Sequence, residues 1–273
     1  MTKESLPLIL EPEALNELIP DSNLLLVAVV QAAVFDVQHI PGSVLVQPAE
    51  LVSGIKPAVG KLPSVDQINK LFSRIGLSNE KHVIVYDDEG GGWAGRLIWT
   101  LDLIGHRNYS YLNGGLPAWL KLGFNLSNSN SAIKPIPSNF STQVNTTELV
   151  TIDDMLAQIA EPDTIIWDAR TKEEYEGSKI TAQRNGHIPG AVNLNWLDLQ
   201  DREHDLRLKP LSDIASQLQE IGIDKHKKII THCETHHRSG LTYLVGKALG
   251  YDIRAYDGSW SEWGNHPNTP IEN

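Results

Sequence analysis

The chain has 273 residues, which leaves room for one large or two ordinary domains. Its apolar content of 41% and charged content of 21% are typical of a soluble globular protein. Acidic residues outnumber basic ones by 34 to 23, for a net charge of −11, and no basic stripe is visible, so nucleic acid is not an expected partner. A single cysteine excludes an intramolecular disulfide.

The first residues carry no sign of export. After Met1 to Ser5 comes only a short apolar patch, Leu6 to Leu10, which Pro7 interrupts. This patch is too short for the core of a signal peptide, and no stretch is long and apolar enough to span a bilayer. We therefore expect the protein to be cytoplasmic.

Helical and strand patterns alternate along the chain. In the first half we expect a helix at 12–19, a strand at 24–29, a helix at 64–75, a strand at 83–86 and a helix ending at 104. In the second half we expect a helix at 152–159, a strand at 165–167, a helix at 213–220 and a strand at 228–231. Ser64 and Gln67 form a predicted capping box. Short strands alternating with helices predict an α/β fold with mostly parallel sheets flanked by helices.

The two halves of the sequence resemble each other. His39-Ile40-Pro41-Gly42 recurs as His187-Ile188-Pro189-Gly190, which predicts a structural role for the shared histidine. The segment 83–105 aligns without a gap onto 228–250, with Asp88 opposite Cys233 and Trp93 opposite Arg238. The halves are separated by a stretch rich in Ser, Asn, Thr and Pro. We predict a first domain at 1–125, a linker at 126–147 and a second domain at 148–273.

The stretch from Cys233 to Arg238 has the strongest chemical signal. It follows the predicted strand and precedes an apolar helical pattern from Leu241 to Leu249. Ligands bind at the carboxyl ends of strands in open α/β sheets, and the N–H groups of a helix N-terminus favour negative charge. Arg238 adds a permanent cation, so a thiol there is expected to react as a thiolate. Cys233 is therefore the predicted nucleophile, although most lone cysteines are inert core residues.

These motifs together resemble the rhodanese superfamily. The resemblance rests on the two tandem halves, each with a His-Ile-Pro-Gly element, on Asp168-Ala169-Arg170 and on the ending 258–263. The loop itself, which reads Cys-Glu-Thr-His-His-Arg, is similar to that of bacterial tandem-domain thiosulfate sulfurtransferases. The resemblance implies two rhodanese-like domains, of which only the second keeps the cysteine.

The resemblance also implies an activity. A family member of this kind moves a sulfane sulfur from thiosulfate or a similar donor to cyanide or another thiophilic acceptor, through a persulfide on the loop cysteine. Carried onto this chain, it implies Cys233 and Arg238 as catalytic residues. It implies a substrate-binding set of Glu234, Thr235, His236, His237 and Trp196, although a packed core tryptophan is an equal alternative for Trp196. Glu234 weakens the positive field of the loop.

No cofactor is implied, and no Cys/His spacing fits a metal site. The expected partners are a small anionic sulfur donor and a thiophilic acceptor, with a protein sulfur acceptor as a further candidate and no membrane. We expect Asp168 and Arg170 to form a structural ion pair rather than to line the site.

Two rival functions stay open at this point. A cysteine-dependent phosphatase also carries a His-Cys followed by an arginine, but phosphatases of that kind place five residues between Cys and Arg. Here four residues lie between Cys233 and Arg238, a tighter ring that suits a single sulfur atom better than a phosphoryl group. The second rival is a non-catalytic binding or regulatory module, which the first half resembles because it has lost the nucleophile.

Overall fold

A computed structural model describes residues 6–19 and 21–273. Residues 1–5 lie outside this range. The expectation of a cytoplasmic location rested in part on these residues. Among the described residues, no helix is both long and apolar enough to cross a membrane.

Two compact units divide the chain. The first, unit 1, runs up to Leu51 and adds 63–145 and 201–208, and the second, unit 2, comprises 52–62, 146–200 and 209–273. Each unit thus includes a short segment from the other half of the sequence, an exchange that the sequence alone does not indicate. The predicted division at residues 125 and 147 stays a prediction.

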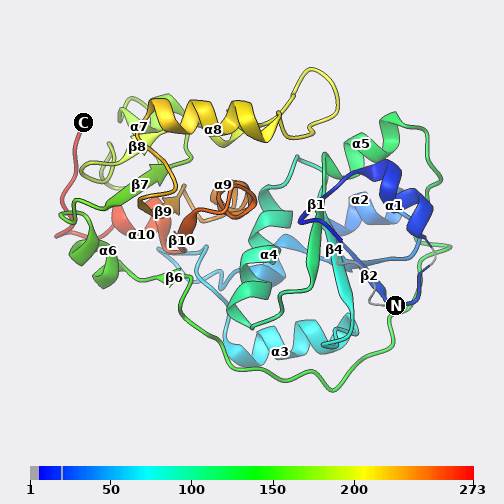
Figure 1. Cartoon of the computed structure of the whole chain (residues 1–273). Coiled ribbons are helices and arrows are strands. Elements are labelled where there is room, and N and C mark those ends of the chain that lie inside the picture. Colours follow the sequence, from blue (N-terminus) through cyan, green and yellow to red (C-terminus); the bar gives the residue numbers. More distant parts are fainter. Residues whose placement is uncertain (1–5, 20) are drawn as a thin grey trace. The chain divides into compact units, whose positions relative to one another are not determined.

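Unit 1 contains a five-stranded sheet in the order β1-β5-β4-β2-β3, in which every pairing is parallel. Its strands are β1 (Ile9–Leu10), β2 (Leu24–Val29), β3 (Ser43–Val46), β4 (His82–Tyr86) and β5 (Tyr109–Leu112). Its helices are α1 (Pro12–Leu18), α2 (Ala32–Val37), η1 (Pro48–Leu51), α3 (Val65–Arg74), α4 (Gly92–Leu103) and α5 (Gly115–Lys121). Figure 1 shows α1, α2 and α5 on one face of this sheet and α4 on the other.

Unit 2 repeats this plan with the order β6-β10-β9-β7-β8, again with parallel pairings throughout. Its strands are β6 (Leu149–Val150), β7 (Thr164–Asp168), β8 (Val192–Asn193), β9 (Lys228–His232) and β10 (Asp252–Tyr256). Its helices are α6 (Ile152–Gln158), α7 (Lys172–Tyr175), η2 (Trp196–Leu199), α8 (Leu211–Glu220), α9 (Arg238–Ala248) and α10 (Ser259–Trp263). The expected α/β class with parallel sheets in both halves is confirmed.

The observed elements follow from the patterns that predicted them. The run of apolar residues in β2 is buried from its second residue onward, because helices cover both faces of the sheet. The capping box at the start of α3 is present, with Ser64 accepting from the Gln67 N–H and the Gln67 side chain accepting from the Ser64 N–H. Predicted element ends differ from the observed ones by one or two residues at most of the compared ends, as is common at frayed termini.

Equivalent helices enclose the core on one face of each sheet. In unit 1, Leu15 of α1, Phe35 of α2 and Trp119 of α5 pack against strand residues. In unit 2, Met155 of α6 and Trp260 of α10 do the same. The other face of each sheet carries the helix that follows the central strand, α4 or α9, so the loop before that helix lies at the carboxyl edge of the sheet.

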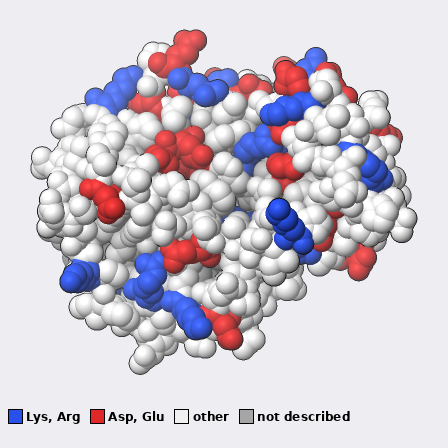
Figure 2. Space-filling view, turned by 180° about the vertical axis from the view of Figure 1, so that it is seen from behind, with Lys and Arg blue, Asp and Glu red and all other residues white. Residues whose placement is uncertain are grey.

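Charged side chains do not segregate strongly by sign. On the face of the molecule in Figure 2, Lys and Arg lie interspersed with Asp and Glu rather than forming one continuous basic band. This distribution agrees with the acidic net charge of −11. The expectation that nucleic acid is not a partner stays a prediction.

Candidate active site

Cys233 lies immediately after β9, the central strand of the second sheet, and five residues before Arg238 at the start of α9. The strand is there because Ile229 and Ile230 are fully buried between helices. Cys233 itself is fully buried. The predicted position of Cys233, between the end of β9 and the start of α9, is therefore observed. Its role as the nucleophile stays a prediction.

The segment at the start of α10 holds the main chain of the loop. The N–H groups of Trp260 and Ser261 donate to the carbonyl oxygens of Cys233 and Glu234, both at 2.9 Å. The Ser259 hydroxyl accepts from the Cys233 N–H at 3.4 Å. Ser259 has a φ of 51°, in the left-handed region that disfavours side chains. A serine held there is a strained position next to the nucleophile, and sequence reasoning did not assign it a role.

A hydroxyl group contacts the sulfur atom itself. Ser239, in the first turn of α9, donates from Oγ to the Cys233 Sγ at 3.4 Å. The same Oγ lies 2.7 Å from Nδ1 of His236, which is fully buried and has a φ of 54°. The predicted substrate residue His236 is thus directed at Ser239. The sequence analysis did not predict the hydrogen bond from Ser239 to the sulfur atom. The position of Ser239, one residue after Arg238, was the only feature of the sequence that could have indicated it.

Arg238 is engaged by a carboxylate. Its guanidinium donates to both oxygens of Glu174, at 2.6 and 3.1 Å, and its side chain is only 16% exposed. Burial raises the pKa of Glu174, but the hydrogen bonds and charge of Arg238 outweigh it and lower that pKa to about 2. Burial lowers the pKa of Arg238, whereas the Glu174 hydrogen bond and the nearby Cys233 raise it, with a net rise. The predicted catalytic role of Arg238 stays a prediction, and Glu174 is its unforeseen partner.

Other predicted substrate residues lie in the loop, as Glu234 and His237 do, or beside it, as Trp196 does. The Glu234 carboxylate accepts from the Thr181 hydroxyl at 2.8 Å, and burial raises the pKa of Glu234. The ring of Trp196, in η2, lies 5.7 Å from that of His237, with the planes tilted by 57°. Trp196 is 8% exposed, so it both packs in the interior and flanks the loop. Because burial disfavours the ionised form of Glu234, this side chain repels an anionic sulfur donor less than a fully ionised carboxylate would.

Behind the loop lies a buried ion pair. Arg170 donates from Nε and Nη2 to Asp168 at 2.6 to 3.0 Å, and both side chains have no exposed area. The Arg170 guanidinium also lies 4.3 Å from the centre of the Trp260 ring, a cation–π contact. Burial raises the pKa of Asp168, but the charges of His232 and Arg170 bring it below its ordinary value. The predicted ion pair between Asp168 and Arg170 is confirmed, and its purely structural role stays a prediction.

The histidine shared by both halves also has equivalent structural contacts. His39 Nδ1 lies 2.8 Å from the Phe35 carbonyl oxygen, and His187 Nδ1 lies 2.9 Å from that of Tyr175. Each imidazole stacks on the ring of the same residue at 3.8 Å between centres. The same arrangement with and without a neighbouring cysteine supports the structural role predicted for this histidine.

The structure shows that the ungapped alignment of the two halves, which placed Asp88 opposite Cys233, is wrong by one residue in this loop. β4 ends at Tyr86, which pairs with Ala28, and β9 ends at His232, which pairs with Asp168. Strand pairing therefore places Asp87, not Asp88, opposite Cys233. The ungapped alignment followed α4 and α9, after which Gly105 and Gly250 correspond, and it missed one additional residue in the glycine-rich loop of unit 1.

Asp87 fills its own loop. Its fully buried carboxylate accepts hydrogen bonds of 2.8 to 3.2 Å from the backbone N–H groups of Glu89, Gly90, Gly91 and Ala94. Burial and the charge of Glu89 raise the pKa of Asp87 to about 6, while these N–H groups act in the opposite direction. The loop of unit 1 is thus an anion cradle whose anion is part of the chain. In unit 2 a thiol stands at the equivalent position.

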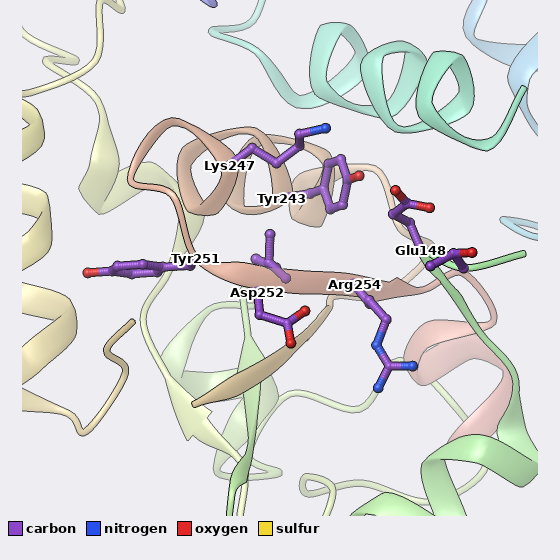
Figure 3. Close-up of a pocket in the computed structure, with 8 residues that line it drawn as sticks. Glu148, Tyr243, Lys247, Tyr251, Asp252 and Arg254 are labelled. Atoms are coloured by element: carbon purple, nitrogen blue, oxygen red, sulfur yellow. The ribbon is translucent and has the colours of Figure 1, made fainter. Parts of the chain in front are cut away.

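A separate hollow of about 240 Å³ lies elsewhere in unit 2 (Figure 3). It is lined by residues of α9, of β10 and of the chain before β6, including Lys247, Arg254, Glu148 and Asp252. Its charges balance, and neither Cys233 nor any other loop residue lines it. The chemistry predicted from the sequence therefore does not belong to this hollow. Among the described residues, no group of three or more His, Cys, Asp or Glu could hold a metal ion.

Comparison with curated proteins finds close relatives over the whole chain. The chain is 46% identical over 269 residues to a thiosulfate sulfurtransferase of Azotobacter vinelandii, with 98% of each chain covered. It is 45% identical over 268 residues to a thiosulfate sulfurtransferase of Pseudomonas aeruginosa, which covers 98% of this chain and 97% of that protein.

Solved structures agree on the fold. Wild-type EanB superposes with a TM-score of 0.86 at 20% identity, over 97% of this chain and 69% of that one. YnjE superposes with a TM-score of 0.87 at 18% identity, over 97% of this chain and 68% of that one. The family model for the rhodanese-like domain matches twice, at residues 11–122 and 151–266. The chain belongs to the rhodanese family and carries two copies of its domain.

Proposed function

We propose that this protein is a sulfurtransferase that carries a sulfane sulfur as a persulfide on Cys233. The observation that carries the proposal is the placement of the only thiol of the chain at the N-terminal end of α9, with the Ser239 hydroxyl donating to its sulfur. The names of the two relatives above, thiosulfate sulfurtransferases, support thiosulfate as a donor that this chain also accepts.

The first half-reaction loads the enzyme. The Cys233 thiolate attacks the outer sulfur of thiosulfate, a bond forms between Sγ and that sulfur, and the sulfur–sulfur bond of thiosulfate breaks. Sulfite leaves with the bonding electron pair, and the product on the protein is a persulfide with a negative outer sulfur. The positive end of α9 favours that charge, as Asp87 and its N–H donors illustrate in the equivalent loop.

The second half-reaction unloads it. A thiophilic acceptor such as cyanide attacks the outer sulfur, the persulfide bond breaks, and thiocyanate is released. The bonding electrons return to Sγ, which becomes a thiolate again. A hydrogen bond from Ser239 stabilises this leaving group, and its direction is set by the second contact of the hydroxyl with His236.

The phosphatase alternative is weakened by the size of the loop. Four residues separate Cys233 from Arg238, and both oxygens of Glu174 occupy the guanidinium that a phosphoryl group would need. The second alternative, a binding module without catalysis, suits unit 1, because Asp87 stands there at the position of the Cys233 thiol. A protein sulfur acceptor and a cytoplasmic location stay predictions.

The test compares the unmodified protein with Cys233→Ser. We expect thiocyanate formation from thiosulfate and cyanide by the unmodified protein, its loss in Cys233→Ser, and no hydrolysis of p-nitrophenyl phosphate by either. The control is Ser216→Ala, in an exposed turn of α8, which should keep full activity. Thiocyanate formation by Cys233→Ser, with its fold verified by circular dichroism, would rule out the persulfide mechanism.

A further inference from the structure

A segment from the first half of the sequence, residues 52–62, is part of unit 2. It forms a closed loop, because the Ser53 N–H donates to the Lys61 carbonyl oxygen at 2.7 Å and the Gly54 N–H donates to that of Val59 at 3.0 Å. The segment therefore has a conformation of its own and is not a loose connection.

Two polar contacts anchor this segment beside the catalytic loop. The Leu62 N–H donates to the Asp257 carboxylate at 2.8 Å, and the Lys61 ammonium pairs with Glu262 at 2.8 Å. Asp257 and Glu262 flank the stretch of α10 whose N–H groups hold the carbonyl oxygens of Cys233 and Glu234. The segment and the catalytic loop thus share one support.

Gly60 touches the catalytic loop directly. A Cβ atom placed on this residue would lie 2.0 Å from the carbonyl oxygen of Thr235, 2.6 Å from its carbonyl carbon and 2.8 Å from its Cα. All three are backbone atoms, so no change of side-chain rotamer relieves the overlap. Since the φ of Gly60 lies outside the left-handed region, the glycine is needed for space and not for conformation.

We infer that Gly60 is a positioning residue for the Cys233 loop, an inference that rests on the proposed function. Thr235 precedes His236, whose left-handed φ of 54° turns its side chain toward Ser239 and hence toward the Cys233 sulfur. By bracing the Thr235 carbonyl, the segment fixes the turn on which this hydrogen-bond chain depends. The first half of the sequence, which lacks a nucleophile, therefore contributes to sulfur transfer in the second.

The reciprocal segment provides a matched control. In unit 1, the Leu208 N–H donates to the Asn113 side-chain oxygen at 2.8 Å, as the Leu62 N–H does to Asp257 in unit 2. Counted from this contact, Leu206 occupies the place of Gly60. Leu206 carries a large side chain at that place, with a left-handed φ of 60°, whereas Gly60 lacks a left-handed φ and has no room for a Cβ atom against the catalytic loop.

The test measures steady-state sulfur transfer from thiosulfate to cyanide by the full-length variants Gly60→Ala and Leu206→Ala. The added Cβ atom overlaps the Thr235 backbone and should displace the loop by about 1 Å. A displacement of this size lowers kcat on the order of ten- to a hundredfold, and we expect such a loss in Gly60→Ala. The rate of Cys233 alkylation by iodoacetamide should change with it, while Leu206→Ala keeps wild-type kcat and alkylation. A Gly60→Ala protein with unchanged kcat and alkylation rate would overturn the inference.

A second variant covers the case in which Gly60→Ala does not fold. Lys61→Met removes the ion pair with Glu262 at a side chain that is 41% exposed, so the fold should be retained. We expect kcat to fall by about two- to fivefold with KM unchanged, since an ion pair of this exposure contributes up to about 1 kcal/mol. Unchanged kcat in Lys61→Met would contradict the inference. Activity in Cys233→Ser would instead refute the proposed function, so the two failures are distinguishable.

Discussion

The loops after β4 and β9 stand at the same place in two copies of one fold, but different groups occupy them. In unit 1, Asp87 supplies a carboxylate that the backbone N–H groups of its own loop bind. In unit 2, Cys233 supplies a sulfur atom that a serine hydroxyl contacts. The difference teaches that a cradle of N–H groups can be filled by the chain itself, as Asp87 does in unit 1. In the proposed function, the anion bound in unit 2 is instead a sulfur atom taken from the substrate.

The two units also differ in what supports the loop. Behind Cys233 lie the Asp168–Arg170 and Glu174–Arg238 pairs, whereas unit 1 has Ala28 in the place of Asp168 and Trp93 in the place of Arg238. Buried ion pairs contribute little net stability but are costly to break. Both pairs lie beside the Cys233 loop, and unit 1 has neither the Asp168 nor the Arg238 counterpart.

The largest effect is expected from Asp168→Ala. The substitution leaves the Arg170 guanidinium buried without its carboxylate, and breaking a buried pair in this way costs about 3–5 kcal/mol. The free energy of unfolding from urea denaturation measures the loss. The control is Glu50→Ala, which breaks a half-exposed pair with Arg74 and should cost at most about 1 kcal/mol. Equal losses in the two variants would show that the pair behind the loop has no special role.

Glu174→Gln is expected to have the next largest effect. Because the pKa of Glu174 is lowered from 4.5 to about 2, its ionised form stabilises the folded state by about 3 kcal/mol at neutral pH. This contribution is present above the ordinary pKa and is lost as the pH falls toward 2. The difference in unfolding free energy between the unmodified protein and the variant should therefore shrink over that window. A difference independent of pH would contradict the pairing with Arg238.

A smaller effect is expected from Glu234→Gln, which removes the carboxylate from the catalytic loop. The kcat/KM for thiosulfate should rise by at most about fivefold, corresponding to about 1 kcal/mol of repulsion. Since burial raises the pKa of Glu234, the wild-type carboxyl becomes neutral at a higher pH than usual, and the advantage of the variant should decrease as the pH is lowered. A lower kcat/KM in the variant would instead indicate that Glu234 assists the reaction.

No gain of sulfur transfer is expected when a thiol is placed in the loop after β4 of unit 1. Asp87→Cys in a Cys233→Ser background should form no thiocyanate, although the new cysteine occupies the position equivalent to Cys233. Asp88 and Glu89 repel anionic donors there, and Ala94 offers no hydroxyl in the place of Ser239. Sulfur transfer by this double variant would show that the N–H cradle alone suffices, and the distinction drawn between the loops would fail.

Much of the fold was predictable from the sequence, because short patterns of neighbouring residues determine the individual helices and strands. The apolar run of β2 and the capping box at Ser64 identified their elements, and the repeated His-Ile-Pro-Gly motif revealed the duplication. Cys233 could be placed at the end of a strand for the same reason. The register of Asp87 could not, because an insertion within a glycine-rich loop leaves no trace in an ungapped alignment.

The supports of the site were not predictable, because they join residues that are distant in the sequence. Glu174 meets Arg238 across 64 residues, and Gly60 meets Thr235 only because a segment of the first half folds into unit 2. No periodicity or spacing encodes such contacts. The Ser259 hydroxyl likewise acquires its place beside Cys233 only when the α10 segment folds onto the loop.

The most direct measurement is the intact mass of the protein after incubation with thiosulfate and removal of excess reagent. The account predicts a gain equal to one sulfur atom, located by peptide mapping to the peptide that contains Cys233 and reversed by cyanide. No gain should occur in Cys233→Ser, while Asp87→Ala should gain one sulfur like the unmodified protein. An unchanged mass, or a sulfur located on a peptide without Cys233, would contradict the central claim that this residue alone carries the transferred sulfur.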